Sequence, residues 1–294
     1  MTEVPAPELP LDRVAIWGVG LMGGSLGMAL RWAGAAREVV GIGRDRRTLR
    51  VAQELGAVDR WETDPEAGMA GAQLLVLGAP VRVIRDQAAE WGPRVPEGCV
   101  VTDLGSTKAE VVAAWEAHIA PGAAFVGSHP MAGSERAGVR AARPDLYRGA
   151  RWVITPTPAT PPWAAALVAR VAEAVGARVL WMPPDLHDRR VAYVSHLPQI
   201  VATATAAAAQ KGDEAVGWVM SLAAGGFRDT TRVAASPVYL WQDILLTNRD
   251  PVLAALADFR EALDGLEAAV RAGDPEGIAR WFSRAHEARS RLAL

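Results

Sequence analysis

Short apolar runs alternate with longer amphipathic stretches along the first 182 residues of the chain. The apolar runs have the length of strands and lie at residues 13–17, 38–43, 57–58, 73–78, 99–103, 123–126, 150–156 and 178–182. Helical patterns lie between them, at residues 25–33, 46–55, 81–91 and 163–175, and residues 104–108 open another helix. Strands that alternate with helices form a mostly parallel sheet with helices on both faces. The pattern therefore predicts an α/β fold with a doubly wound sheet.

The pattern changes after the pair Pro183-Pro184. Strand-like runs vanish there, and long helical patterns continue to the end, with breaks near Gly212, Gly225-Gly226, Pro237, Asp250-Pro251 and Gly273-Asp274-Pro275. The first ten residues are acidic and proline-rich and carry no secretory signal pattern. We therefore expect a flexible N-terminal tail over residues 1–10, a sheet domain over 11–184 and an all-α C-terminal domain over 185–294.

Composition narrows the class of partner. Half of the residues are hydrophobic, so the chain can bury a large core. Charged residues make up 22% of the chain and leave a net charge of -2, which provides no basic field for nucleic acid or an anionic membrane. No apolar run approaches the roughly 20 residues that span a bilayer. Cys99 is the only cysteine, which excludes an internal disulfide framework and a cysteine-based zinc cluster. These features favour a cytoplasmic protein that binds small molecules.

A glycine-rich turn follows the first predicted strand and opens the first predicted helix. Gly18 permits a tight turn, Gly20 lets a pyrophosphate approach the backbone, and Gly23 lets helix and strand pack closely. Leu21 and Met22 lie in the same turn, where the helix N-terminus favours an anion. The alternative is a purely structural turn. The flanking strand and helix favour a Rossmann-type dinucleotide-binding domain.

The end of the second predicted strand bears on which dinucleotide binds. NAD-binding folds usually carry an acidic residue there, on the ribose 2'-hydroxyl, but Gly43 occupies the position. Arg44 and Arg46 follow, and guanidinium groups suit a 2'-phosphate. NADP is therefore favoured. NAD stays possible, because these arginines could be a solvated helix start while Asp45 serves NAD.

Three further segments follow strands and are expected at the same sheet edge. They are Ala79-Pro80, the loop with Ser106, and a polar, glycine-rich loop over 127–135 that presents His129. Ligands bind at the carboxyl ends of parallel strands, so Ala79, Pro80 and Ser106 are expected at the cofactor, with His129 nearby. An ordinary turn around a structural histidine is the alternative.

Two polar stretches in the helical part also indicate chemistry. They are Ser195–Gln199 and Gly225–Arg232. Arg232 could bind a substrate carboxylate through two hydrogen bonds while Asp229 holds its guanidinium group. A surface arginine beside a capping aspartate is the alternative.

With these segments in place, the sequence closely resembles the prephenate/arogenate dehydrogenase family, the oxidoreductases of tyrosine biosynthesis. The resemblance is carried by residues 18–24, 103–108, 127–135, 195–198 and 226–232, followed nine residues later by Trp241. It implies an oxidative decarboxylation: a hydride passes from the carbinol carbon of a cyclohexadienol to the nicotinamide while the ring carboxylate leaves as carbon dioxide. It implies no metal.

The resemblance also implies roles for single residues. His129 would hold and then take the hydroxyl proton, which suits a neutral imidazole. Ser106 matches the family's active-site serine and would hydrogen-bond the same hydroxyl or His129. Glu135 matches a position that can pair with Arg232, near Asp229, and so gate the substrate site; a carboxylate that stabilises a helix N-terminus is the alternative for Glu135.

The substrate side chain is where this sequence departs from the family. His196 matches a histidine near the substrate, with packing as its alternative, and His187 and Trp241 are second-tier candidates for substrate contacts. Gln199 stands where members often carry a second histidine, which leaves open whether prephenate or arogenate is preferred. Tyrosine, if it inhibits, would act at the active site. By analogy of fold, the helical domain is expected to form a homodimer.

Two other functions remain open at this point. A β-hydroxyacid dehydrogenase would require a catalytic lysine in the helical domain, where Lys211 is the one candidate. A catalytically silent NADP-sensing module would keep the glycine turn without needing His129. His118 and His286 lie in charged helical surroundings and are expected at the surface.

Overall fold

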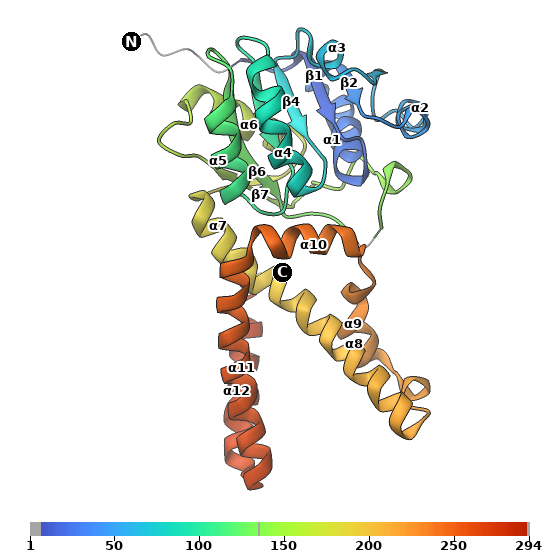
Figure 1. The fold of residues 1–294 in the computed structure, drawn as a ribbon, viewed down its shortest axis with the longest axis vertical. Coiled ribbons are helices and arrows are strands. Elements are labelled where there is room, and N and C mark those ends of the chain that lie inside the picture. The colour runs from blue at the N-terminus through green and yellow to red at the C-terminus, as the bar shows by residue number, and fades with distance from the viewer. Residues whose placement is uncertain (1–6, 135, 293–294) are drawn as a thin grey trace. The chain divides into compact units, whose positions relative to one another are not determined.

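The computed structural model describes residues 7–134 and 136–292. One eight-stranded sheet organises the first part of the chain, in the strand order β3-β2-β1-β4-β5-β6-β7-β8 (Figure 1). The strands are β1 Leu11–Trp17, β2 Ala36–Ile42, β3 Arg60–Glu62, β4 Leu74–Leu77, β5 Val100–Asp103, β6 Ala124–Pro130, β7 Arg151–Thr155 and β8 Arg178–Trp181. Strands β1 to β6 pair in parallel, as do β7 and β8, whereas β6 and β7 pair antiparallel. The predicted α/β class is confirmed.

Helices cover both faces of this sheet. Their bounds are α1 Leu21–Trp32, α2 Arg46–Glu54, α3 Pro65–Met69, α4 Val81–Trp91, α5 Ala109–His118 and α6 Pro162–Ala174. Alternate residues of a strand face opposite sides, so Val76 on β4 packs with α1 and α6, whereas Leu75 packs with α4 and α5. Each fully buried aliphatic side chain of this kind contributes about 1.5 to 3 kcal/mol to folding.

The third strand lies a few residues later than the sequence pattern predicted. Ala57 and Val58 are buried but unpaired in the sheet, and β3 begins at Arg60. The amide of Ala57 donates to the carbonyl of Ala52 and closes the end of α2. A methyl group on Gly27 of α1 would come within 1.9 Å of the Ala57 carbonyl oxygen, so this segment packs directly under α1. Its apolar character therefore serves helix packing rather than strand pairing.

The predicted loop around His129 is a strand instead. Strand β6 continues through Ser128 and His129 to Pro130, past the point where its parallel neighbour β5 ends. The continuation pairs with β7, with His129 opposite Val153. Because β7 runs antiparallel, its ladder extends β6 beyond the carboxyl edge of the sheet, so the histidine sits on hydrogen-bonded backbone.

A helical segment follows the sheet within the same compact unit, which spans Met1–Asn248. It consists of α7 Pro184–Val191, a π-helical turn Ala192–His196, α8 Leu197–Val216, α9 Gly225–Thr231, a 3-10 turn Arg232–Ala235 and α10 Val238–Thr247 (Figure 1). The break predicted near Gly212 is wrong, because α8 runs through it. A helical glycine costs only about 1 kcal/mol, and α8 ends instead at Gly217, whose φ is 68°.

The second compact unit, Arg249–Leu294, contains two helices, α11 Arg249–Ala272 and α12 Pro275–Ser290. Helix α11 carries Pro251 in its first turn, where proline is tolerated because that amide needs no helical partner. Asp274 caps α12 through the amide of Glu276. The structure divides into compact units after Asn248. The predicted domain boundary between residues 184 and 185 stays a prediction.

Candidate active site

A cleft of about 670 Å3 lies in the first unit, between the carboxyl edge of the sheet and the helical segment. It is lined from the sheet side by the glycine turn and by the segments after β4, β5 and β6, and from the helical side by α8, the turn after α9 and α10. The predicted site residues among its lining are Gly20, Leu21, Met22, Ala79, Pro80, Ser106, His129, Gln199, Arg232 and Trp241. The cleft therefore brings together predicted cofactor, catalytic and substrate residues.

The glycines of the turn have two roles: two of them allow close packing, and one leaves open space in the cleft. Gly18 has φ 104°, and a Cβ there would come within 2.7 Å of the Gly78 carbonyl carbon. A Cβ on Gly23 would lie 2.1 Å from the carbonyl oxygen of Gly18. The close packing of the turn therefore requires glycine at positions 18 and 23, and neither residue is among the described lining of the cleft. A Cβ on Gly20 would meet nothing within 4 Å among the described atoms, and Gly20 faces the cleft.

This turn fits a dinucleotide. Gly20 is the N-cap of α1 and supplies no side-chain hydrogen bond to the first turn of the helix. The amides of that turn are thus available to an anion, as at other dinucleotide-binding helix N-termini. A bare backbone at Gly20 leaves room for the pyrophosphate to approach. The free amides at the N-terminus of α1 and the open space at Gly20 therefore suit the pyrophosphate of NAD(P).

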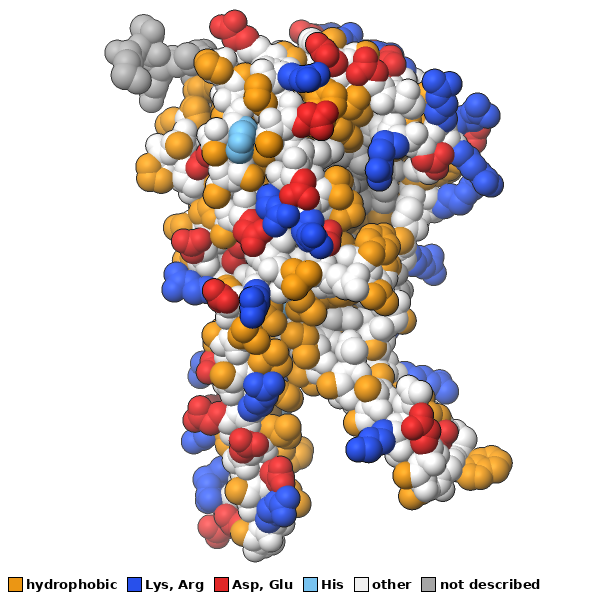
Figure 2. All heavy atoms as spheres, viewed as in Figure 1, with side chains coloured by type: hydrophobic (Ala, Val, Ile, Leu, Met, Phe, Trp, Pro, Cys, Tyr) orange, Lys and Arg blue, Asp and Glu red, His pale blue; other side chains and the backbone are white. Residues whose placement is uncertain are grey.

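The arginines after β2 lie outside this lining. Gly43 follows β2, and Arg44 and Arg46 are exposed beside it. Figure 2 shows Lys and Arg side chains gathered over α2, where Arg47 and Arg50 are also exposed. Their guanidinium groups form a positively charged surface at the β2 end of the glycine turn.

Asp45 has a separate structural task beside them. Its carboxylate accepts hydrogen bonds from the amides of Arg47 and Thr48 and from the Thr48 hydroxyl, at 3.0, 3.2 and 2.6 Å. The hydroxyl bond from Thr48 and the amide bond from Arg47 lower the pKa of this carboxyl. Asp45 is therefore the N-cap of α2.

The catalytic candidates Ser106 and His129 both line the cleft. Ser106 is half-buried in the loop after β5, and His129 is 9% exposed on β6. His129 Nδ1 lies 2.9 Å from Nε2 of His187, and His187 Nδ1 lies 2.7 Å from Asp188 Oδ1. Burial, then the neighbouring His187 and Lys108, hold the pKa of His129 well below its usual range. His129 is therefore neutral at physiological pH.

Asp188 also fastens helix α5 to helix α7. Its Oδ1 accepts the amide of Lys108 and its Oδ2 accepts the amide of Ala109, both at 2.8 Å. Lys108 is the N-cap of α5 and Ala109 is its first residue, and amides at a helix N-terminus lack helical acceptors. The Asp188 carboxylate thus caps α5, which lies 80 residues earlier in the chain, and the same carboxylate contacts His187.

A buried ion pair supports the histidine strand from behind. Lys108 is fully buried, donates to Asp103 through its ammonium group, and donates to the carbonyl of Ser128 at 2.8 Å. Asp103 also accepts the amide of Ser128 at 3.0 Å. A buried charge left alone costs several kcal/mol, so each partner depends on the other. Together they lock the residue before His129 to β5.

The helical side of the cleft supplies side chains. Arg232 lies in the turn after α9, Trp241 on α10 and Gln199 on α8, and all three line the cleft. Gln199 is 6% exposed, and its Oε1 is buried without a hydrogen-bond partner among the described residues. A buried amide oxygen with no partner is costly, so a ligand that donates to it would be stabilised.

His196 lies behind this wall. It is fully buried and accepts a hydrogen bond at Nδ1 from the side-chain amide of Asn248, at 3.0 Å. Its ring meets Trp241 edge-on, with centroids 6.0 Å apart. Burial lowers the pKa of His196 to about 4. The histidine therefore supports Trp241 from behind. His196 is not among the described residues that line the cleft.

The other two predicted substrate residues are placed differently. Asp229 is exposed on α9, outside the set of described lining residues. Glu135 lies outside the described residues, so its predicted pairing with Arg232 stays a prediction. Lys211, the candidate for β-hydroxyacid chemistry, is exposed within α8 and is likewise left out of the described lining. His118 and His286 are exposed, as expected.

Sequence reasoning missed most of the network behind His129. The sequence indicates His187 only as a second-tier candidate, and it assigns no role to Asp188, Lys108 or Asn248. A usable signal was present for two of them. Lys108 is one of only two lysines in the chain, and Asp188 directly follows a histidine just after the Pro-Pro boundary. Within residues 7–134 and 136–292, no group of histidine, cysteine, aspartate and glutamate is arranged to hold a metal.

The fold and this cleft define an oxidoreductase of the NAD(P)-dependent dehydrogenase class. Residues 26–181 match the family described as prephenate dehydrogenase, nucleotide-binding domain, and residues 183–284 match prephenate dehydrogenase, dimerization domain. The chain is also 31% identical over 286 residues to prephenate dehydrogenase of Bacillus subtilis, covering 96% of this chain and 76% of that one. The chain belongs to the prephenate dehydrogenase family.

Solved structures agree with this membership. The chain superposes on prephenate dehydrogenase from Aquifex aeolicus, solved with hydroxyphenyl propionate and NAD+, with a TM-score of 0.90 at 32% identity, covering 97% of this chain and 99% of that one. It superposes on Synechocystis arogenate dehydrogenase with a TM-score of 0.80 at 28% identity, covering 95% and 99%. Both substrate types thus occur among its structural relatives.

Proposed function

We propose that the chain oxidatively decarboxylates prephenate to 4-hydroxyphenylpyruvate, with hydride transfer to NAD(P), in tyrosine biosynthesis. The observation that carries this proposal is that one cleft is lined by the glycine turn, by His129 and Ser106, and by Arg232 of the helical segment. The names of the relatives support it. Arogenate dehydrogenase, giving tyrosine directly, is the alternative.

The chain's own residues would act on the substrate as follows. His129, kept neutral by burial, accepts the proton of the ring hydroxyl as the hydride leaves the same carbon. Ser106 orients that hydroxyl by hydrogen bonding. The nicotinamide, when bound, supplies the hydride acceptor. Loss of the ring carboxylate as carbon dioxide then leaves an aromatic phenol.

Substrate binding is assigned to the helical side of the cleft. Arg232 would hold the side-chain carboxylate through paired hydrogen bonds, the geometry a guanidinium group favours. Trp241, supported by His196, would cover the ring. Asp229 and Glu135 are kept as a proposed gate around Arg232.

Gln199 bears on the choice between prephenate and arogenate. Its amide offers an acceptor for the ammonium group of arogenate and, turned over, a donor for the keto oxygen of prephenate. The unpartnered Oε1 is the observation that keeps arogenate as the second candidate. An uncharged amide gives neither group an ion pair, so we expect modest discrimination.

For the cofactor we propose a preference for NADP over NAD. The alternative role for Asp45, binding the ribose of NAD, is less favoured because its carboxylate is engaged in capping α2. Gly43 leaves the position free of negative charge, and Arg44 and Arg46 are exposed next to it. These features support recognition of a 2'-phosphate.

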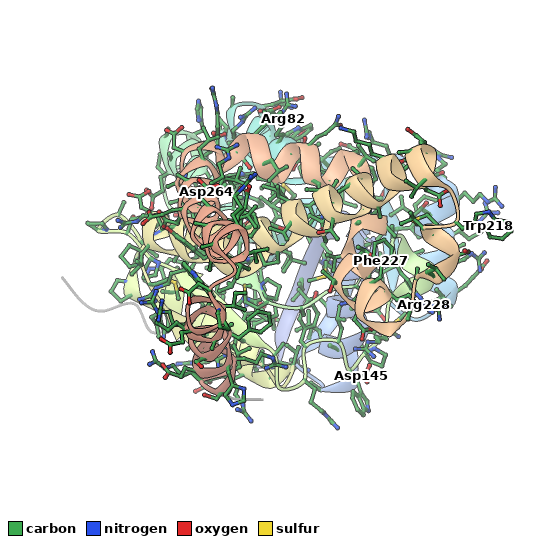
Figure 3. All side chains as sticks on the ribbon, turned by 90° about the horizontal axis from the view of Figure 1, so that it is seen from below. Arg82, Asp145, Trp218, Phe227, Arg228 and Asp264 are labelled. Atoms are coloured by element: carbon green, nitrogen blue, oxygen red, sulfur yellow. The ribbon has the colours of Figure 1, made fainter. Side chains whose placement is uncertain are left out.

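We propose that the chain acts as a homodimer through its helical part. Several large apolar side chains there are exposed, including Trp218 at 81% and Leu222 at 82%. Figure 3 shows Trp218 projecting from the outer end of the helical segment. Contiguous exposed apolar surface usually marks an interface, and residues 183–284 match a dimerization domain. Light scattering of the purified chain tests this.

Two further predictions stay open. If tyrosine inhibits the chain, we expect it to bind in the same cleft and compete with substrate. A cytoplasmic location also stays a prediction; the structure adds that none of the helices it describes is long and apolar enough to cross a membrane.

Steady-state kinetics over four combinations, prephenate or arogenate with NAD or NADP, tests the proposal. We expect the highest kcat/KM with prephenate and NADP. Faster turnover of arogenate would move the chain to the alternative function, and preference for NAD would refute the cofactor proposal. Absence of turnover with both substrates would refute the proposed enzymatic function. The catalytically silent NADP-sensing module would then be the remaining hypothesis.

A further inference from the structure

We propose that His187 and Asp188 act on His129 as a relay: they fix which ring nitrogen of His129 faces the substrate, and His187 takes up the charge that His129 acquires. We call the three side chains the His129–His187–Asp188 relay. Its catalytic part rests on the proposed function, in which His129 removes the hydroxyl proton. The relay makes His187 and Asp188 positioning residues rather than packing.

The direction of the hydrogen bonds is set at Asp188. Both of its oxygens accept backbone amides of α5, from Lys108 and Ala109. A carboxylate engaged in this way is an acceptor. The 2.7 Å contact with His187 therefore requires a proton on His187 Nδ1, which donates to Oδ1.

The same logic fixes the state of His129. A neutral imidazole carries one ring proton, so with Nδ1 protonated the Nε2 of His187 is an acceptor. The 2.9 Å contact between His187 Nε2 and His129 Nδ1 needs one donor, which must be His129 Nδ1. Nε2 of His129 is then left with a free lone pair. Because Nδ1 is turned towards His187, this lone pair is the one available to a substrate hydroxyl.

The surroundings make this arrangement firm. His129, His187 and Asp188 are 9%, 1% and 2% exposed, so water competes little for their hydrogen bonds. The other groups that face the rings are Lys108 of α5, Asp103 of β5 and His196 of the π-helical turn, with Arg232 across the cleft. Burial is the main cause that lowers the pKa of His187 too, so both rings start neutral.

Proton transfer through the relay balances. The substrate O–H bond breaks and a bond from hydrogen to Nε2 of His129 forms. The proton on His129 Nδ1 passes to Nε2 of His187. His129 is again neutral, while His187 is an imidazolium that donates to the ionised carboxylate of Asp188. The positive charge thus ends beside a carboxylate instead of beside the substrate, and the proton returns to solvent by the reverse route after product leaves.

The experiment combines nitrogen NMR of histidine-labelled protein with kinetics of three variants. In the unsubstituted protein we expect His129 with its proton on Nδ1 and a bare Nε2. His187→Phe fills the same space but removes the acceptor, so we expect mixed tautomers and a kcat lowered about 10- to 100-fold, with little change in KM. His187→Gln retains an acceptor but cannot carry a proton. It should keep the tautomer and recover only part of kcat.

His118→Phe is the matched control, since His118 is exposed on α5 and outside the relay. We expect it to leave the kcat and the His129 signals unchanged. A proton on His129 Nε2 in the unsubstituted protein would overturn the relay, as would a His187→Phe variant with unchanged kcat. The NMR result needs no turnover, so it judges the tautomer even if both substrates prove inert. His187→Gln and His187→Phe leave the α5 cap in place, so either remains informative if the other fails to fold.

Discussion

The two sides of the cleft are built from different materials. On the cofactor side, binding space comes from backbone: Gly18 and Gly23 have no room for a Cβ, and Gly20 leaves a surface of bare peptide. On the substrate side, the lining comes from side chains of the helical segment, and Arg232, Gln199 and Trp241 are among its polar and aromatic groups. This contrast indicates on which side of the cleft substrate specificity can change. A backbone cradle tolerates few substitutions, whereas a wall of side chains can be altered one residue at a time.

His129 stands between the two sides, and its replacement should have the largest effect. His129→Asn should lower kcat by about 10² to 10⁴ with little change in KM for substrate or cofactor, because a general base acts mainly in the transition state. Steady-state kinetics measures this. His118→Asn, at an exposed histidine, is the control. An unchanged kcat would remove His129 from the role of base.

Arg232→Ala tests the substrate side. We expect a rise in KM for the substrate that corresponds to about 2 to 4 kcal/mol, with the KM for the dinucleotide unaffected, since a paired carboxylate contact is lost. Arg189→Ala, at an exposed arginine of α7, serves as the control. If the KM for the substrate stays the same, the arginine is structural and the side-chain wall is defined by other residues.

Acid should weaken the substrate side through His196. The pKa of this histidine is about 4 in the folded chain and 6.5 as its ordinary value, so the unfolded state binds the proton first. Stability is therefore fully present above pH 6.5 and is lost as pH falls towards 4, by about 3 kcal/mol for this group. Urea unfolding at several pH values measures it. His196→Asn should show a shallower loss, and an identical pH dependence would contradict the assignment.

Gly20→Ala probes the cofactor side without disturbing the fold. The added methyl group meets no atom of the described chain but would occupy the space assigned to the pyrophosphate. We expect the KM for the dinucleotide to rise by an amount that corresponds to about 1 to 3 kcal/mol, with an unchanged melting temperature. Gly212→Ala within α8 is the control. An unaltered KM would mean that the dinucleotide does not approach this peptide.

The smallest effect is expected where the cofactor side does use side chains. Gly43→Asp should shift preference from NADP towards NAD by about 1 kcal/mol, because exposed charges are screened by solvent. Its Cβ would lie 3.3 Å from Leu49, so that side chain must shift slightly. The ratio of kcat/KM values for the two dinucleotides measures the effect. No change in that ratio would refute the argument from the missing carboxylate.

The cofactor side could be predicted from the sequence because its signals are local. The glycine spacing, the flanking strand and the helix all lie within one short stretch, and the doubly wound sheet follows from the alternation of elements. Errors arose where tertiary contacts decide. Ala57 and Val58 look like a strand but pack under α1, and His129 looks like a loop residue until the antiparallel partner β7 is known.

The substrate side and the histidine network were harder to read for the same reason. Hydrogen bonds join His129 to His187 across 58 residues and Asp188 to α5 across 80. The position of Asp188 directly after His187 is visible in the sequence, but no local pattern encodes which distant groups the two side chains contact. The motifs around Gln199 and Arg232 did indicate chemistry, but only the fold brings them to one cleft.

The buried ion pair of Lys108 has a practical consequence for chemical labelling. The chain contains two lysines, Lys108 and Lys211. Lys211 is exposed on α8, whereas Lys108 is fully enclosed with Asp103. Amine-reactive dyes should therefore attach to one lysine side chain of the folded protein and gain the second only when the core opens. The time course of that second attachment would record global unfolding under native conditions.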